Sequence, residues 1–282
     1  MLRPENTKNM ANSTSGLLTI RQNNPSSESN LHYLWCAGII LLAAILRLWG
    51  YWLEPCLDRD AITYIMMART WYDTSSFVEF GKAAGHGNAL MPFYCFLIKS
   101  LMHTGSSAET AGILISIIAG SLLPLIVLGI ARACRMENGM VYGSALLSAV
   151  FPPLVEISHL VLRDSLYLFL AGGSIWCILT GIRDRCSGWW AGGGLFLALA
   201  AFTRYEALEL LPICMVYWGI FWKIYRKMRC HIWKAAIAFL SGFLITAVLL
   251  FLLMEIPLLY LEIYWERLLS YWWVMVENLG GI

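Results

Sequence analysis

An acidic cluster stands just beyond the first hydrophobic segment of this chain, where Asp58, Arg59 and Asp60 follow one another. An ionisable side chain at the mouth of an apolar segment commonly marks a substrate site, an ion path or a proton relay. The spacing beyond the acid, with steps of 4, 4 and 3 residues, predicts a helix that begins there. One face of that helix carries Asp60, Tyr64, Ala68 and Trp71.

Composition identifies the class of protein that presents this cluster. Of the 282 residues, 59% are hydrophobic and only 13% are charged, and the mean hydropathy is +0.64. A soluble domain carries about 25% charged residues, so we expect an all-α protein whose helices form a polytopic membrane bundle. The net charge of +2 gives no sign of a nucleic-acid surface. The eight cysteines form neither a CxxC motif nor a Cys/His spacing, so they predict no metal site.

Eight apolar runs outline the path of the chain through a bilayer, which needs about 20 residues per helix. They are residues 33–53, 89–103, 109–131, 139–161, 165–182, 188–204, 207–223 and 235–256. Basic residues at 132–135, 183–185 and 223–234 place those loops in the cytoplasm by the positive-inside rule. Only one crossing then fits between residues 54 and 132. Because the run 89–103 is short and contains Pro92 and Lys99, we expect it to be a re-entrant or interfacial helix and the seven other runs to span.

The same topology divides the chain into three parts. Residues 1–32, which are polar and rich in Asn and Ser, are predicted to form a disordered cytoplasmic tail. Residues 33–256 are predicted to form the transmembrane domain, with an outer loop at 54–108. Residues 257–282 are expected to form an exoplasmic tail.

Charged residues gather at the span ends that this topology places on the outer face. Three groups join the acidic cluster there: Glu156 with His159, Arg163 with Asp164, and Arg204 with Glu206. Several clusters on one side favour a shared polar cavity, and the alternative is a set of interfacial anchors whose charged ends reach water. Structural roles also remain open for single residues. Asp60 and Asp164 can be helix N-caps, and His86, between two glycines, can be a loop residue.

Four segments, taken in order, resemble the GT-C-type integral membrane glycosyltransferases, which include protein O-mannosyltransferases, lipid A aminoarabinose transferases and oligosaccharyltransferases. The segments are Arg59-Asp60-x-x-x-Tyr64-x-x-x-Ala68, the His86 and Pro92 stretch at 85–94, Phe151-Pro152-Pro153 through Arg163-Asp164-Ser165-Leu166-Tyr167, and Ala201-Phe202-Thr203-Arg204-Tyr205-Glu206-Ala207. The likeness covers roughly residues 35–225. The family usually has a Pro-Pro pair in the second segment, where this chain has Pro92 alone.

The resemblance implies a multi-pass enzyme of the plasma or inner membrane, with its active site on the exoplasmic side and a polyprenyl-phosphate-linked sugar as donor. The acceptor is a protein, a lipid or a glycan. An acceptor hydroxyl needs a general base, and the resemblance gives this role to Asp60. The leaving polyprenyl phosphate needs a cation, for which Arg204 is the first candidate and Arg163 or Arg59 the substitutes.

Other residues are candidates for binding or orienting groups in the same reaction. Asp164 can bind the acceptor, orient an arginine or hold a divalent ion, since paired carboxylates recruit hard cations, although no ligand spacing here demands one. Glu206 and Asp58 are candidates for the same roles. The secondary candidates are Tyr64, His86, Glu156 and His159.

Two other functions stay open at this point. A transporter or flippase-like carrier would place charges near the bilayer midplane and contain paired broken helices. A non-catalytic partner subunit is the second alternative. Family members generally continue through more spans, so we expect a short member, half of a split enzyme or a truncated product, and in the latter cases a partner subunit.

Overall fold

The structure, a computed structural model, describes residues 25–53, 58–88, 92–224 and 229–257 and a few single residues beyond them, excluding the side chains of 25–31, 84–88 and 221–230. Two compact units make up the chain, residues 1–37 and 38–282. In the first unit the described residues belong to helix α1 (Pro25–Leu53). A proline suits the first turn of a helix because its missing N–H has no helical acceptor there. Residues 25–32, which we expected in the tail, are therefore helical, and residues 1–24 lie outside the described part.

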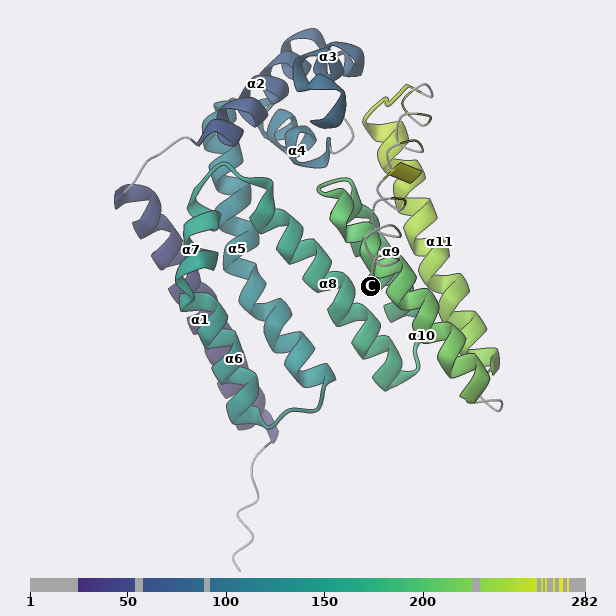
Figure 1. The fold of residues 1–282 in the computed structure, drawn as a ribbon. Coiled ribbons are helices and arrows are strands. Elements are labelled where there is room, and N and C mark those ends of the chain that lie inside the picture. The colour runs from purple at the N-terminus through teal and green to yellow at the C-terminus, as the bar shows by residue number, and fades with distance from the viewer. Residues whose placement is uncertain are drawn as a thin grey trace, which may run out of the picture. The chain divides into compact units, whose positions relative to one another are not determined.

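The second unit is also built of helices, and its described ranges contain no strand (Figure 1). After α1 they are α2 (Arg59–Thr74), α3 (Phe77–Asn88), α4 (Phe93–Met102), α5 (Ala108–Ala133), α6 (Asn138–Val150), α7 (Pro152–His159), α8 (Arg163–Asp184), α9 (Ser187–Ala201), the 3-10 helix η1 (Tyr205–Glu209), α10 (Leu210–Ile224) and α11 (Arg229–Leu253). Of the predicted exoplasmic tail 257–282, most residues lie outside the described part.

Four helices are long and apolar enough to cross a bilayer, namely α1 from His32, α5, α8 and α11 from His231. The pair α6 and α7, bent by 49°, provides a fifth candidate if it counts as one span. The predicted all-α membrane bundle is therefore confirmed, but within the described residues four or five helices meet this test rather than seven. The difference lies in α9 and α10, whose 15 residues each extend over less than the ~30 Å of a hydrocarbon core.

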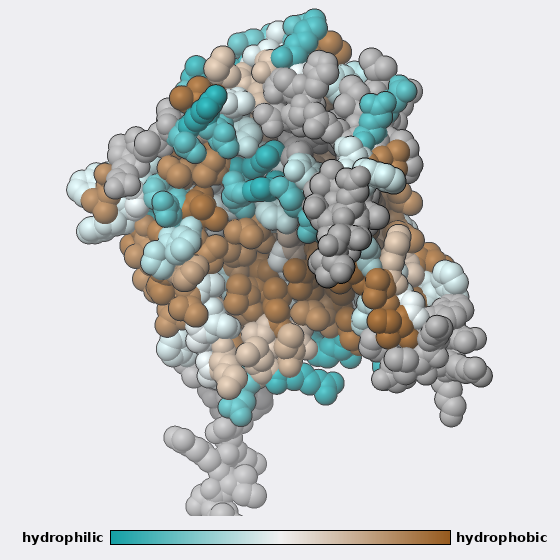
Figure 2. Space-filling model, viewed as in Figure 1, coloured by the Kyte–Doolittle hydropathy of each residue, from teal (hydrophilic) through white to brown (hydrophobic). Residues whose placement is uncertain are grey.

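Helix α4 corresponds to the run that we expected not to cross. Its 10 residues cover about 15 Å at 1.5 Å per residue, which is half of what a crossing needs. With α2 and α3 it lies at one end of the unit (Figure 1). Figure 2 shows hydrophilic side chains at that end and a band of hydrophobic ones along the helices below it.

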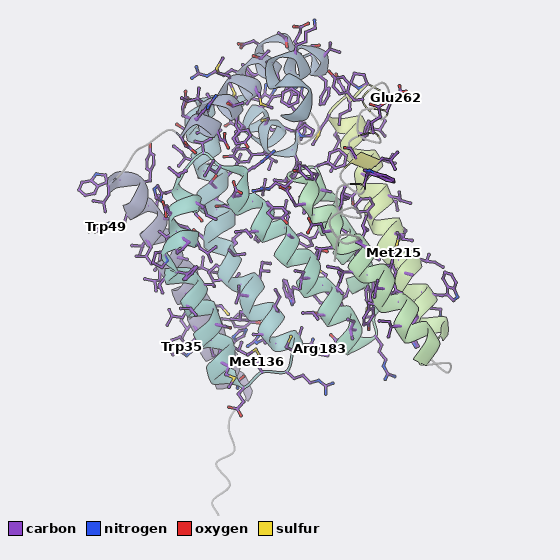
Figure 3. All side chains as sticks on the ribbon, viewed as in Figure 1. Trp35, Trp49, Met136, Arg183, Met215 and Glu262 are labelled. Carbon is purple, nitrogen blue, oxygen red and sulfur yellow. The ribbon has the colours of Figure 1, made fainter. Side chains whose placement is uncertain are left out.

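The opposite end of the unit carries the basic loops. Figure 3 shows Met136 and Arg183 there, away from α2, α3 and α4. The Arg183 Nη1 atom donates a hydrogen bond to the Arg132 carbonyl oxygen over 3.3 Å. The basic segments 132–135 and 183–185 therefore lie at the same end of the helices, as the alternating topology requires.

Glycines allow the spans to approach one another closely. A Cβ atom at Gly194 of α9 would collide with the Phe239 carbonyl oxygen of α11, and one at Gly242 of α11 would collide with the Ala191 carbonyl oxygen of α9. Small residues at such contacts let two backbones meet in the membrane, where packing drives helix association.

Helix α2 packs its predicted face against the rest of the unit. Tyr64, Ala68 and Trp71 are buried, whereas Asp60, one turn earlier on that face, is exposed. The Trp71 ring lies 4.5 Å from Phe80 and 5.9 Å from Phe96, and the Lys99 ammonium lies 4.9 Å from its centre. The aromatic contacts fix α2 against α3 and α4, and Asp60 stands at the free end of this arrangement.

Arg47 is the one charged residue inside the apolar run 33–53, and its side chain is completely buried. Its Nη1 atom donates to the carbonyl oxygens of Ala43, over 2.9 Å, and Ala149, over 3.3 Å. The Ala149 oxygen lacks its usual helical donor because the residue four positions later is Pro153, which has no N–H. Arg47 thus satisfies a backbone group that the break between α6 and α7 leaves open, which matters where no water can replace it.

We expect Arg47→Met to destabilise the wild type more than it destabilises a Pro152→Ala/Pro153→Ala variant. Alanine at 152 removes the proline that disfavours a helical Phe151, and alanine at 153 supplies an N–H for the Ala149 oxygen, so the coupling should be about 1 kcal/mol. Thermal unfolding of the four detergent-purified proteins, followed by circular dichroism, measures it. Pro152→Ala alone is the matched control, because position 153 then still has no N–H. Equal destabilisation in all backgrounds would contradict this role for Arg47.

Candidate functional site

An arginine held by two carboxylates forms the centre of the candidate site. The Arg204 Nη1 atom pairs with Oδ1 of Asp164, at the start of α8. Its Nη2 and Nε atoms donate to the two Glu206 oxygens over 2.9 and 3.3 Å. All three side chains are about 30% exposed, at 28% for Arg204, 32% for Asp164 and 29% for Glu206. The sequence predicted these residues at one outer mouth, and the structure brings them together.

The turn after α9 positions Arg204. Thr203 is fully buried, and its hydroxyl donates to the Leu199 carbonyl oxygen over 2.9 Å. The Arg204 N–H then bonds to the Ala200 oxygen over 2.7 Å, while its own backbone is extended. The 3-10 helix η1 begins directly after it, so Glu206 returns toward the guanidinium two residues later. This is the tight turn that the Thr-Arg-x-Glu segment predicts.

The pair of Arg204 and Glu206 sets the ionisation of both groups. Hydrogen bonds to Glu206 are the largest influence on Arg204, and they raise its pKa above the usual value. Burial opposes ionisation of Glu206, but the hydrogen bonds and charge of Arg204 outweigh it, so the pKa of Glu206 is lowered. Arg163 adds a favourable charge nearby. Both partners therefore remain charged at neutral pH.

Tyr64 connects helix α2 to the start of α8. The Arg163 guanidinium lies 5.5 Å from the centre of the Tyr64 ring, which is within the range of a cation–π contact. Burial raises the pKa of Tyr64 to about 12, and the charge of Arg163 partly opposes this. Asp60 and Asp164 are both close enough to Tyr64 to raise its pKa further. Asp60 and Asp164 thus both lie near the same tyrosine.

Asp58, rather than Asp60, caps helix α2. The backbone of Asp58 is extended, and its Oδ1 atom accepts the Arg59 N–H over 2.7 Å. The helix begins one residue earlier than we expected, which leaves Asp60 in the first turn with its carboxylate exposed. Asp164 is likewise inside its helix, because the N-cap of α8 is Leu162. The N-cap alternatives for Asp60 and Asp164 are therefore wrong, and both carboxylates lie in the first turn of their helices.

The remaining predicted candidates lie apart from Arg204. Glu156 is exposed on α7. His159 is buried near Gly50 of α1, and its Nδ1 atom lies 3.2 Å from the Val155 oxygen. Arg59 is exposed next to Asp58. The side chain of His86, in α3, lies outside the described residues. A single cavity shared by all of these groups stays a prediction.

Two residues near the start of α8 lie in the third of the matching segments but received no role from the sequence. Tyr167 lies one turn after Arg163, and the Arg204 guanidinium is 5.5 Å from its ring centre. Ser165 donates to the Ile157 oxygen and to Ser158, which fixes the start of α8 against α7. The available signal for both was their place in that segment. Arg47, in α1, also received no role, and its position as a lone charge in an apolar run was the available signal.

Metal binding has no three-ligand site in the described part of the chain, where no group of three His, Cys, Asp or Glu residues could hold an ion. The carboxylates of Asp164 and Glu206 instead bind one guanidinium, which satisfies both with charge-assisted hydrogen bonds. Asp164 had three predicted roles, namely to bind the acceptor, to orient an arginine or to hold a metal ion. Its ion pair with Arg204 fits the second of these.

Comparison with known proteins adds a family to this geometry. Residues 85–252, more than half of the chain, match the model of the dolichyl-phosphate-mannose-protein mannosyltransferase family. The matched segment includes Arg163, Asp164, Arg204 and Glu206, while Asp60 precedes it. No curated protein and no solved structure gave a significant match. The family match agrees with the GT-C resemblance drawn from the sequence.

Glu206→Gln should lower the unfolding midpoint near pH 7 by about 2–4 °C, as expected for the loss of a pair worth about 1 kcal/mol. Because the folded pKa of Glu206 lies below its ordinary 4.5, the pair contributes fully above that value. Its contribution is lost as the pH falls through the lowered folded pKa. The midpoint difference from the wild type should therefore shrink only in acid. Glu156→Gln, the same change at an exposed site, is the control, and a difference that does not depend on pH would contradict this assignment.

Proposed function

The chain belongs to the dolichyl-phosphate-mannose-protein mannosyltransferase family, and we propose that it moves a hexose from a polyprenyl-phosphate carrier to an acceptor hydroxyl. The family match makes it an integral membrane glycosyltransferase with a lipid-linked sugar donor. The choice of hexose, with mannose first, follows the family description. The exoplasmic placement of the reaction rests on the basic loops at 132–135 and 183–185, which lie at the end of the bundle away from Arg204.

The observation that carries the proposal is the pairing of Arg204 with Asp164 and Glu206. A guanidinium has five N–H donors, and three of its nitrogen–oxygen contacts here are made with the two acids. Each terminal nitrogen retains one further donor. Arg204 is therefore held in a fixed orientation by its acids and can still donate to a phosphate oxygen.

The reaction needs a cation because charge develops on the leaving group. As the bond between the anomeric carbon and the phosphate oxygen breaks, that oxygen keeps the bonding electron pair and becomes part of a polyprenyl phosphate anion. Donors held in place before the reaction stabilise such charge more effectively than donors that must first reorient. Arg204 provides this stabilisation in our proposal, with Arg163 beside Tyr64 as a second cation.

Asp60 is the proposed general base. The acceptor oxygen attacks the anomeric carbon, and its proton passes to the Asp60 carboxylate. This carboxylate is exposed and does not cap its helix. Tyr64, one turn along α2, keeps that helix close to Arg163 and Asp164. In this proposal the general base lies on α2. The cations that stabilise the leaving group lie on α8 and on the turn after α9.

Asp60→Asn should reduce sugar transfer by about 10²–10⁴-fold, since an amide cannot take up the acceptor's proton. Transfer from a radiolabelled polyprenyl-phosphate sugar, in membranes with equal amounts of wild type and variant, measures it. Asp73→Asn makes the same chemical change at an exposed position near the other end of α2, and it should leave transfer unchanged. Full activity in Asp60→Asn would remove the assignment. No transfer by the wild type with any donor would favour a non-catalytic partner subunit.

Arg204→Lys should also impair transfer, by raising the donor KM and lowering kcat together. Lysine keeps the charge but has no planar fork, so it cannot contact Asp164 and both Glu206 oxygens at once. Initial rates over a range of donor concentrations separate the two constants. Arg69→Lys, an exposed arginine of α2, is the matched control. Wild-type kinetics in Arg204→Lys would mean that charge alone suffices and that the acids do not serve orientation.

A further inference from the structure

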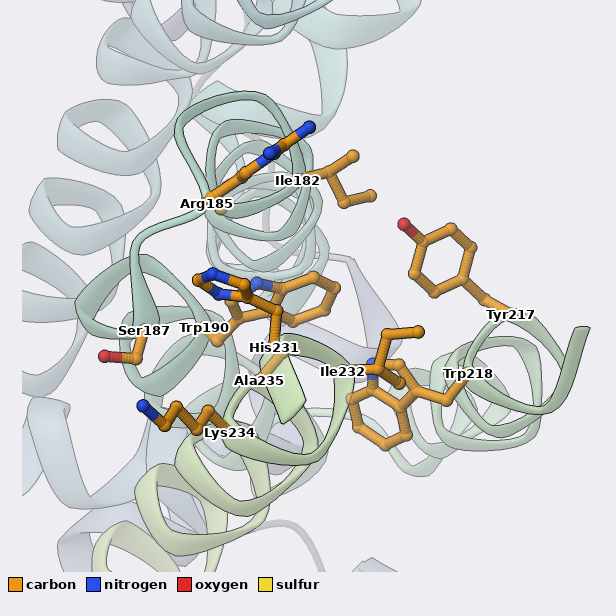
Figure 4. A pocket seen from close by; sticks show the side chains of 11 residues that line it. Ile182, Arg185, Ser187, Trp190, Tyr217, Trp218, His231, Ile232, Lys234 and Ala235 are labelled. Carbon is orange, nitrogen blue, oxygen red and sulfur yellow. The ribbon is translucent and has the colours of Figure 1, made fainter. Parts of the chain in front are cut away.

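A cavity of about 470 Å³ lies at the other end of α8 and α9, away from Arg204. It opens where α8 ends and α9 begins, and α10 and α11 form its remaining walls (Figure 4). Three of its side chains can carry a positive charge, namely Arg185, His231 and Lys234. Three others are aromatic, namely Trp190, Tyr217 and Trp218.

The lining provides hydrogen-bond donors as well as charge. The Trp218 Nε1 atom is buried and, among the described residues, has no hydrogen-bond partner. The Trp190 ring lies 5.9 Å from that of Trp218, so the two indoles form one aromatic wall. His231, Arg185 and Lys234 line the same cavity as the two indoles, and in the view of Figure 4 Arg185 lies above the His231 ring and Lys234 below it. A buried indole N–H without an acceptor is a group that a bound ligand can satisfy.

The backbone at Arg185 is held in an uncommon conformation. Its φ of 53° is left-handed, at the position after a helix where glycine is usual. Such strain in a non-glycine residue is often retained at a binding site. As a result, the residue that follows the last turn of α8 is Arg185, whose cationic side chain lines the cavity.

No acid balances these cations within the described lining. The nearest acid in sequence is Asp184, and both of its oxygens bind Arg183, over 2.6 and 2.9 Å. Arg204 at the opposite end has two carboxylates, whereas Arg185 and Lys234 have no carboxylate within salt-bridge distance among the described residues. The cavity therefore suits a ligand with negative charge and oxygen acceptors.

We propose that this cavity binds the phosphate of an anionic phospholipid headgroup. The flanking helices present apolar side chains outward, among them Ile213 and Val216 of α10 and Ile237 and Leu244 of α11, which gives acyl chains a surface to follow. The basic loops place this end at the cytoplasmic leaflet, where anionic lipids and basic pockets between spans occur together. The site is separate from the proposed donor site, because the residues of the two sites lie at opposite ends of α8.

Native mass spectrometry of the detergent-purified full chain tests the proposal by titration with phosphatidylglycerol, phosphatidylcholine and inorganic phosphate. The wild type should retain one phosphatidylglycerol under conditions where it retains no phosphatidylcholine. Arg185→Gln with Lys234→Gln should weaken that binding by about tenfold to thirtyfold. Trp218→Phe removes only the N–H and should weaken it by a few-fold. Arg183→Gln removes a neighbouring charge outside the cavity and should leave the affinity unchanged.

Three outcomes would overturn the proposal. The first is a phosphatidylglycerol affinity equal to that of the wild type both in the Arg185→Gln/Lys234→Gln variant and in the separate Trp218→Phe variant. The second is an equal loss in Arg183→Gln, which would mean general surface charge. The third is displacement of the lipid by an equal concentration of inorganic phosphate, which would identify a free-phosphate site. Circular dichroism verifies that each variant is folded, and none of these results depends on sugar transfer.

Discussion

The absence of water in the bilayer is the constraint on which this structure depends. Each polar group that leaves the interface must find its partner inside the protein, since lipid offers none. Arg47 shows this constraint in part. Its Nη1 atom supplies a donor where a proline pair separates α6 from α7, while its Nε and Nη2 atoms are buried without a partner among the described residues. The same constraint places the other charges at helix ends. The site and the lipid cavity are therefore both features of the ends of the bundle.

The two ends handle charge in different ways. Around Arg204, two acids enclose one cation, and Arg163 brings the group close to neutrality. A neutral, rigid cluster can receive a singly charged phosphodiester donor without strong attraction to every anion in the membrane. It offers directed N–H groups as the second negative charge develops on the leaving phosphate. At the end with Arg185 the cations lack such acids among the described residues. A cluster with unbalanced positive charge suits a headgroup that stays bound. A cluster with balanced charge suits a donor that must bind, react and leave.

Apolar runs and periodicity predicted most of the long helices, but not α3 within the expected outer loop or the break between α6 and α7. They predicted contacts only in part. The spacing of Tyr64, Ala68 and Trp71 gave the buried face of α2, because burial follows one face of a helix whatever lies opposite. The same spacing could not reveal that Tyr64 meets Arg163, which is 99 positions later in number but adjacent in space. The N-cap lies two residues earlier than the alternative at Asp60, since Asp58 and Asp60 are equally good caps by composition. Of the seven predicted spans, α9 and α10 have only 15 residues each, so they fall below the length that identifies a span.

Arg204 shows how sequence order and spatial order meet. Its bond to Glu206 is local and follows from a turn of known type, so the sequence could predict it. Its bond to Asp164 joins the end of one helix to the start of its neighbour, and antiparallel packing of α8 and α9 brings those ends together. Glycines at this interface, such as Gly173 against Phe196, let the two helices pack closely. The electrostatics of the site thus depend on the small residues in the middle of the bundle as well as on its charged residues.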